Sequence, residues 1–237
     1  MTSPPDDSEL AGLDPFDAMD TEAERIANHL AALPPKDWSR PSRCEGWSTK
    51  DVLAHLAASE AYHAACLDGT VKDFVADLGA RGATDLDSAN ALGVEEFRDL
   101  RPEQLLAEWR EANALVRRRF RERGDGTIDT SVGDYPCRWQ AFHVATELAT
   151  HADDIGVTVA AAEEQTRRDW RARFSRFALS EAKPDLTITT DAGRTRVLGP
   201  HADVELDDDE LIGAVQARLT PSDRFSQDVL ARLSTMP

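Results

Sequence analysis

The segment that most constrains the fold of this chain is an alanine-rich stretch, residues 142–154, whose composition predicts a helix. In a helix, Glu147 and His151 lie four residues apart and project from one face, one turn after the other. A carboxylate and an imidazole placed in this way supply two of the three protein ligands that a catalytic divalent metal usually has. The third ligand must come from another segment.

His55 is the best candidate for that third ligand. It lies in a second predicted helix whose start is marked by Ser48, with Asp51 three positions later, a pattern close to a capping box. A site between two helices is therefore expected. The residue types alone leave a second interpretation open, because a histidine in an alanine-rich helix is more often packed or exposed than a ligand.

Two motifs resemble a known family. Residues 38–57 read WSRPSRCEGWSTKDVLAHLA. This run resembles the N-terminal signature of the mycothiol-dependent maleylpyruvate isomerase family, within the DinB-like metalloprotein superfamily. The Glu-x-x-x-His-x-x-Asp run from Glu147 to Asp154 is similar to the second metal motif of that family. The resemblance implies a mainly α protein, with a DinB-like four-helix bundle followed by a small α+β domain, and it implies metal ligands His55, Glu147 and His151.

The resemblance also implies an activity. In that family a divalent metal, with zinc the first choice, activates the thiol of mycothiol, whose sulfur adds to an electrophilic carbon. Expulsion of the thiol after bond rotation gives cis-trans isomerisation, and retention gives a conjugate. We therefore expect a mycothiol-dependent transferase or isomerase that acts on a small electrophile. Two alternatives stay open: a non-catalytic bundle with a structural metal, and a thiol-independent metal hydrolase with the same ligands.

Four further side chains belong to the hypothesis. His143 stands one turn before Glu147, and His63 stands eight residues after His55, so each is a candidate fourth ligand or a neighbour of the ligands. The alternative for both is an ordinary, partly buried histidine. Asp154 is expected to accept a hydrogen bond that orients an imidazole. Cys44 precedes the His55 helix, and packing is favoured over a nucleophilic role because no arranged base is evident nearby.

Composition excludes several classes of partner. The formal net charge of −17 disfavours nucleic-acid backbones and anionic membranes. No apolar run approaches the roughly 20 residues that span a bilayer. The three cysteines lack metal-type pairing and no secretory leader is evident, so we expect a reducing cytoplasm. Scarce lysine beside plentiful arginine and alanine suits the actinobacterial setting that the resemblance implies.

The expected organisation has three parts: a flexible or loosely docked leader over 1–13, the bundle over 14–160, and a linking helix with a small α+β domain over 161–237. In the last part the alternation of apolar residues predicts a hairpin, and the resemblance implies that an arginine, Arg194 or Arg196, helps to bind substrate. The remaining expectations are a loop over 81–93, a long helix over 94–123, a polar loop over 127–139, a strand over 202–206 and a helix over 210–219.

Overall fold

The computed structural model describes residues 6–235, which form two compact units. The first unit comprises residues 14–158. The second contains residues 6–13 together with 159–235. Within residues 6–235, no helix is both long and apolar enough to cross a membrane.

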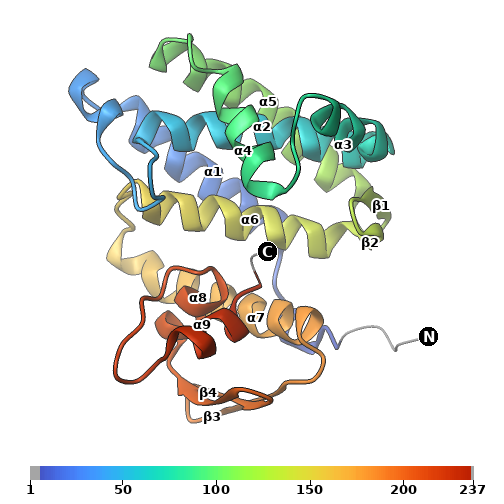
Figure 1. Ribbon diagram of the computed structural model, residues 1–237, viewed down its shortest axis with the longest axis vertical. Coiled ribbons are helices and arrows are strands. Elements are labelled where there is room, and N and C mark those ends of the chain that lie inside the picture. Colours follow the sequence, from blue (N-terminus) through green and yellow to red (C-terminus); the bar gives the residue numbers. More distant parts are fainter. Residues whose placement is uncertain (1–5, 236–237) are drawn as a thin grey trace. The chain divides into compact units, whose positions relative to one another are not determined.

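The first unit is a four-helix bundle with short helices and a β-hairpin added to it. Figure 1 shows its long helices α1, α2, α5 and α6 side by side, and α1 packs against both α5 and α6 while α2 packs against α5. The bounds are α1 Pro15–Ala31, η2 Pro35–Ser39, α2 Thr49–Asp68, α3 Val71–Ala80, α4 Leu86–Glu96, α5 Pro102–Arg123, β1 Thr127–Thr130, β2 Gly133–Pro136 and α6 Cys137–Asp154. The predicted bundle class is confirmed.

The starts of α1 and α2 follow from their capping residues. The Asp14 carboxylate accepts hydrogen bonds from two backbone N–H groups of the first turn of α1, and Pro15 occupies the first helical position. At α2, Ser48 and Asp51 form the predicted capping box, in which the Asp51 carboxylate accepts from the Ser48 N–H at 2.9 Å. Most residues of α2 are buried. Its capped start therefore determines where along the helix each side chain enters the core.

Three expectations about the first unit were wrong. Residues 86–96 form helix α4 rather than a loop, since Asp85 and Ser88 make a second capping box and buried Gly93 lets the helix lie close to Ala58 on α2. The long helix α5 consequently starts at Pro102 and not at residue 94. The segment 127–139 is also not a loop, because 127–136 form a hairpin paired from Thr127↔Pro136 to Thr130↔Gly133, after which α6 starts. These strands have four residues each, too few for a clear alternation in sequence.

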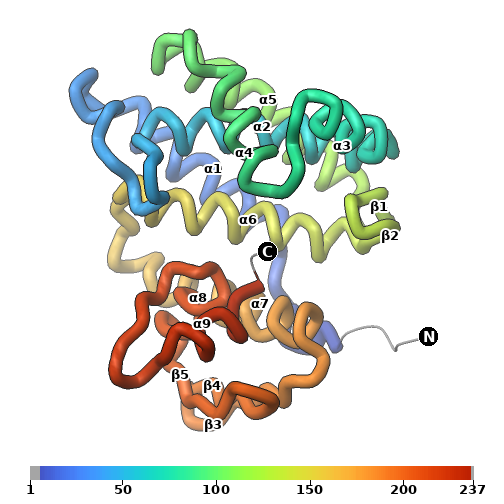
Figure 2. The backbone as a smooth tube through the Cα atoms, viewed as in Figure 1, coloured from blue at the N-terminus to red at the C-terminus, as the bar shows by residue number. Residues whose placement is uncertain are grey.

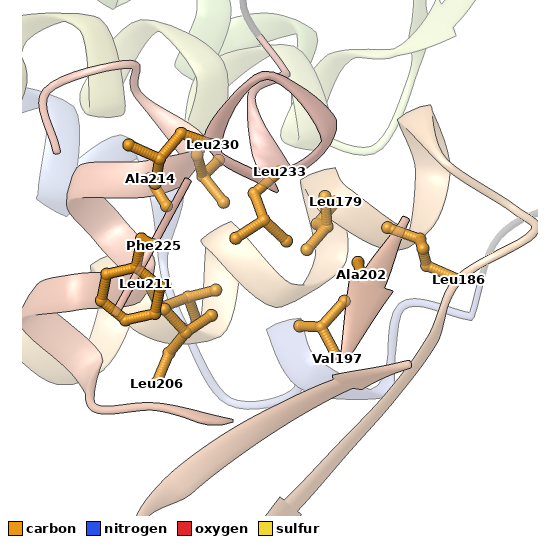
Figure 3. Packing of buried hydrophobic residues seen from close by; sticks show 11 residues of the cluster. Leu179, Leu186, Val197, Ala202, Leu206, Leu211, Ala214, Phe225, Leu230 and Leu233 are labelled. Carbon is orange, nitrogen blue, oxygen red and sulfur yellow. The ribbon is translucent and has the colours of Figure 1, made fainter. Parts of the chain in front are cut away.

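The second unit packs helices on a three-stranded antiparallel sheet of order β3-β4-β5. Its elements are η1 Ser8–Leu10, α7 Ala161–Ala182, β3 Thr187–Asp191, β4 Arg194–Gly199, β5 Ala202–Leu206, α8 Asp208–Val215 and α9 Gln227–Leu233. Figure 3 shows its core, in which Val197 and Leu206 of the sheet lie with Leu211, Phe225 and Leu233. The predicted hairpin and third strand are confirmed, and the helix expected over 210–219 spans 208–215 instead.

The residues before α1 belong to this second unit. Leu10 is buried, and the Arg173 guanidinium donates to the carbonyl oxygens of Glu9 at 2.8 Å and Ala11 at 2.7 Å. Arg176 pairs with the Glu9 carboxylate at 3.0 Å. Of the two alternatives for the leader, flexible or loosely docked, the docked one describes residues 6–13, but its partners on α7 lie more than 160 residues away and could not be read from the sequence. Residues 1–5 lie outside the described part of the chain.

Candidate metal centre

His55 on α2 and the Glu147 and His151 side chains on α6 converge in the bundle. One ligand atom of each lies within 4.8 Å of the others. The His55 Nε2 to Glu147 Oε1 distance is 3.1 Å. Both histidines are 8% exposed, whereas 29% of the Glu147 side chain is accessible, so solvent reaches this group at its carboxylate.

The position of these side chains follows from two local features. Four-residue spacing on α6 places Glu147 and His151 on one face. The loop before α2 is held to the C-terminal end of α6, because the Arg43 N–H donates to the Asp154 carbonyl oxygen at 3.0 Å. Figure 2 shows this light-blue loop reaching the end of yellow α6. The tight turn at Gly46, with φ of 78°, returns the chain to α2.

The electrostatics keep Glu147 ionised. Burial raises the pKa of this carboxyl, but the hydrogen bond from His55 and the nearby imidazoles of His55, His63 and His151 outweigh it, and the pKa falls to about 2. The Ser59 hydroxyl adds a hydrogen bond of 3.2 Å to Oε1. A charged carboxylate at neutral pH is the form that a metal requires.

A buried polar chain starts at the second oxygen of Glu147. His63 Nε2 lies 3.9 Å from Glu147 Oε2, and His63 Nδ1 lies 4.0 Å from Glu60 Oε2. Glu60 Oε1 accepts from Asn113 at 2.7 Å, and Asn113 accepts from Arg117 at 2.7 Å. Burial lowers the pKa of His63, but Glu60 and Glu147 outweigh this effect and the net shift is upward. His63 therefore lies between two carboxylates.

The other predicted residues have different surroundings. The Tyr135 hydroxyl lies 3.2 Å from His143 Nε2, and His143 is outside the group of three ligand candidates. Asp154 is buried and its Oδ2 accepts from Nδ1 of His151 at 3.1 Å. The Nε2 atom of His151 is consequently the nitrogen left for an ion.

Sequence reasoning missed the environment of Cys44. Its Sγ donates to Asp154 Oδ2 at 3.1 Å and lies 3.8 Å from His151 Nδ1. Packing was the favoured interpretation, and no base was evident near Cys44 in the sequence. The base lies 107 residues further along the chain, and the only available signal was the position of Cys44 directly before the His55 helix.

The two arginines considered for substrate binding are engaged within the second unit. Arg194 pairs with the carboxylates of Glu205 and Glu210. Arg196 pairs with Asp203 at 3.3 Å. Each guanidinium therefore already has a carboxylate partner within the second unit.

The donor set fits a divalent ion. Two ligand atoms about 2.05 Å from a tetrahedral ion lie about 3.3 Å apart. The 3.1 Å between His55 Nε2 and Glu147 Oε1 is close to that value, so these two atoms are spaced as ligands of one ion would be. Two imidazoles and one carboxylate suit zinc and other first-row divalent metals.

A four-helix bundle with a His–Glu–His group between two of its helices, a group that could hold a metal ion, has the architecture of a DinB-like bundle. Residues 19–156, more than half of the chain, match the family model described as the mycothiol maleylpyruvate isomerase N-terminal domain. The chain belongs to this family.

Solved structures agree with this fold. The chain is similar to the mycothiol-dependent maleylpyruvate isomerase, with 15% identity and a TM-score of 0.52 over 71% of this chain and 68% of that one. A variant of that enzyme in which a histidine is replaced by alanine gives 13% identity and a TM-score of 0.53 over 71% of each chain. No curated protein matches the sequence.

Proposed function

We propose that this protein is a metal-dependent enzyme that uses mycothiol as a cosubstrate and acts on a small electrophile. The observation that carries the proposal is the convergence of the His55, Glu147 and His151 ligand atoms, with the Glu147 side chain partly accessible to solvent. Membership of the family supports the choice of thiol. The product is either an isomer of the electrophile or its thiol conjugate.

The side chains of the chain have separate tasks in this proposal. His55, Glu147 and His151 would hold a divalent ion, zinc being the first candidate. When bound, such an ion stabilises the thiolate form of a coordinated thiol, whose pKa is ordinarily near 8.5. Asp154 orients His151 by accepting its Nδ1–H, and Ser59 holds Oε1 of Glu147.

The chemistry balances without an oxidant or a reductant. The sulfur of the thiolate forms a bond to one carbon of an electrophilic double bond in the substrate. The electron pair of that double bond moves to its second carbon. Rotation about the resulting single bond, followed by return of the pair and loss of the thiolate, gives the cis-trans isomer. Protonation of the neighbouring carbon instead gives the conjugate.

The ligand group supports an open rather than a closed site. A structural ion is normally enclosed by four protein ligands. Among residues 6–235, the group around His55 has three members, and the two histidines considered as a fourth, His63 and His143, are not part of it. This arrangement favours the catalytic interpretation over a structural metal.

The test is elemental analysis of the purified protein and of its His55→Ala and His151→Ala variants, followed by cobalt substitution. We expect one ion at this site, lost in both variants, and a new cobalt–thiolate band when mycothiol is added. His201→Asn is the matched control, because His201 is exposed on a turn with φ of 61°, which asparagine tolerates. A metal content that both alanine variants retain would contradict the proposal.

A further inference from the structure

A second group of potential ligands lies on the other side of the His151 ring. The atoms are Cys44 Sγ, Asp154 Oδ2 and His151 Nδ1. Their separations are 3.1 Å from sulfur to carboxylate, 3.8 Å from sulfur to nitrogen and 3.1 Å from nitrogen to carboxylate. Because Nδ1 is hydrogen-bonded to Asp154, Nε2 is the nitrogen of the same imidazole left for the group around His55.

These separations are near those of a coordination sphere, though none equals the ideal value. A tetrahedral zinc ion at about 2.3 Å from sulfur and about 2.05 Å from nitrogen and oxygen places its ligands about 3.3 to 3.6 Å apart. The three observed values lie on either side of that range. In the metal-free arrangement the S–H of Cys44 and the N–H of His151 both point at one oxygen of Asp154. An ion would replace both protons, which pass to solvent.

The backbone holds the cysteine in this position. The N–H of Cys44 donates to the Ser42 hydroxyl at 3.1 Å, and the carbonyl of Cys44 accepts from the Trp47 N–H at 3.0 Å. The bond between Arg43 and Asp154 attaches the same loop to the end of α6. The Asp154 side chain is fully buried, whereas Cys44 is only half-buried, so an ion has a route in and solvent can supply a fourth ligand.

We propose that Cys44, Asp154 and Nδ1 of His151 form a second cation site, selective for thiophilic ions such as Zn²⁺ in excess or Cd²⁺. The site inhibits the proposed reaction when filled, because its ion takes both Nδ1 and the carboxylate that orients His151. The inhibitory role rests on the proposed function of His151, but the existence of the site does not. The second ion binds more weakly than the first, since His151 must then lose its remaining ring proton.

The experiment is a titration of the metal-free protein with Co²⁺ in the absence of any added thiol. A sulfur-to-cobalt charge-transfer band in the near-ultraviolet reports a cysteine ligand. We expect the band in the wild type, its complete loss in Cys44→Ser and its retention in His55→Ala. Cys66→Ala is the control, because Cys66 is buried on α2 and outside both ligand groups, and it should keep the band.

The outcomes separate the two claims. Two equivalents of Co²⁺, of which Cys44→Ser loses the one that carries the band, support both sites. One equivalent with a band that depends on Cys44 but not on His55 supports the second site and contradicts the proposed function. One equivalent without a band, lost in His55→Ala, overturns the second site and leaves the proposed function standing. No binding at all refutes both.

Discussion

The buried pair of Glu60 and His63 gives the most demanding test of the polar chain beside the candidate centre. The two residues are each 4% exposed. Among the described residues, Glu60 Oε2 and His63 Nδ1 have no hydrogen-bond partner and lie 4.0 Å apart. His63 is thus the imidazole that offsets the charge of this buried carboxylate, while Asn113 supports its other oxygen.

Replacement of His63 by glutamine leaves the Glu60 carboxylate buried without a cationic neighbour of its own. Removing one partner of a buried pair destabilises a protein by about 3–5 kcal/mol. The lower figure applies here, because Asn113 still donates to Glu60. A loss of about 3 kcal/mol lowers Tm by roughly 6–12 °C in a protein of this size.

A double-mutant cycle in urea measures the coupling. Glu60→Gln together with His63→Gln gives two neutral amides, so the double variant should lose at least ~1 kcal/mol less than the sum of the single variants. The exposed pair Glu95 and Arg98, with the same three-residue spacing, is the control and should show coupling below ~0.5 kcal/mol. Additive losses at Glu60 and His63 would refute the view that His63 offsets the buried charge.

Three further predictions concern the ligands and the packing of the bundle. Asp154→Asn should weaken metal binding about 10–100-fold, since it removes the charged acceptor that orients His151. A competition assay with a chromophoric chelator measures this affinity, and an unchanged value would contradict that role. The pKa of Glu147 is depressed from 4.5 to about 2, so the stability that its charged form adds to the metal-free protein is present above pH 4.5 and is lost as the pH falls towards 2. The difference in Tm between the wild type and Glu147→Gln should therefore shrink between these two pH values. A constant difference would argue against the shift. Gly93→Ala should destabilise by about 1–3 kcal/mol in thermal melts, because its Cβ would come within 2.7 Å of the Ala58 Cβ, and a stabilised variant would show that α4 moves without strain.

Local sequence determined much of the helical framework. Asp14 with Pro15, and Ser48 with Asp51, marked the starts of α1 and α2 because a cap uses residues only a few positions apart. The four-residue spacing on α6 likewise determined that Glu147 and His151 share a face. The alternation around β3 and β4 predicted their hairpin for the same reason, since the signal lies within the segment itself.

Only the tertiary structure decided which distant groups meet. Helix α4 escaped prediction because its amphipathic pattern is weak and its place against α2 depends on one glycine, Gly93. His63 faces Glu147 across 84 residues, and Cys44 meets His151 across 107. Propensity and periodicity act over a few residues, whereas these contacts depend on how whole helices pack. The sequence by itself therefore determined the helices and the spacing of two ligands, and packing decided what surrounds them.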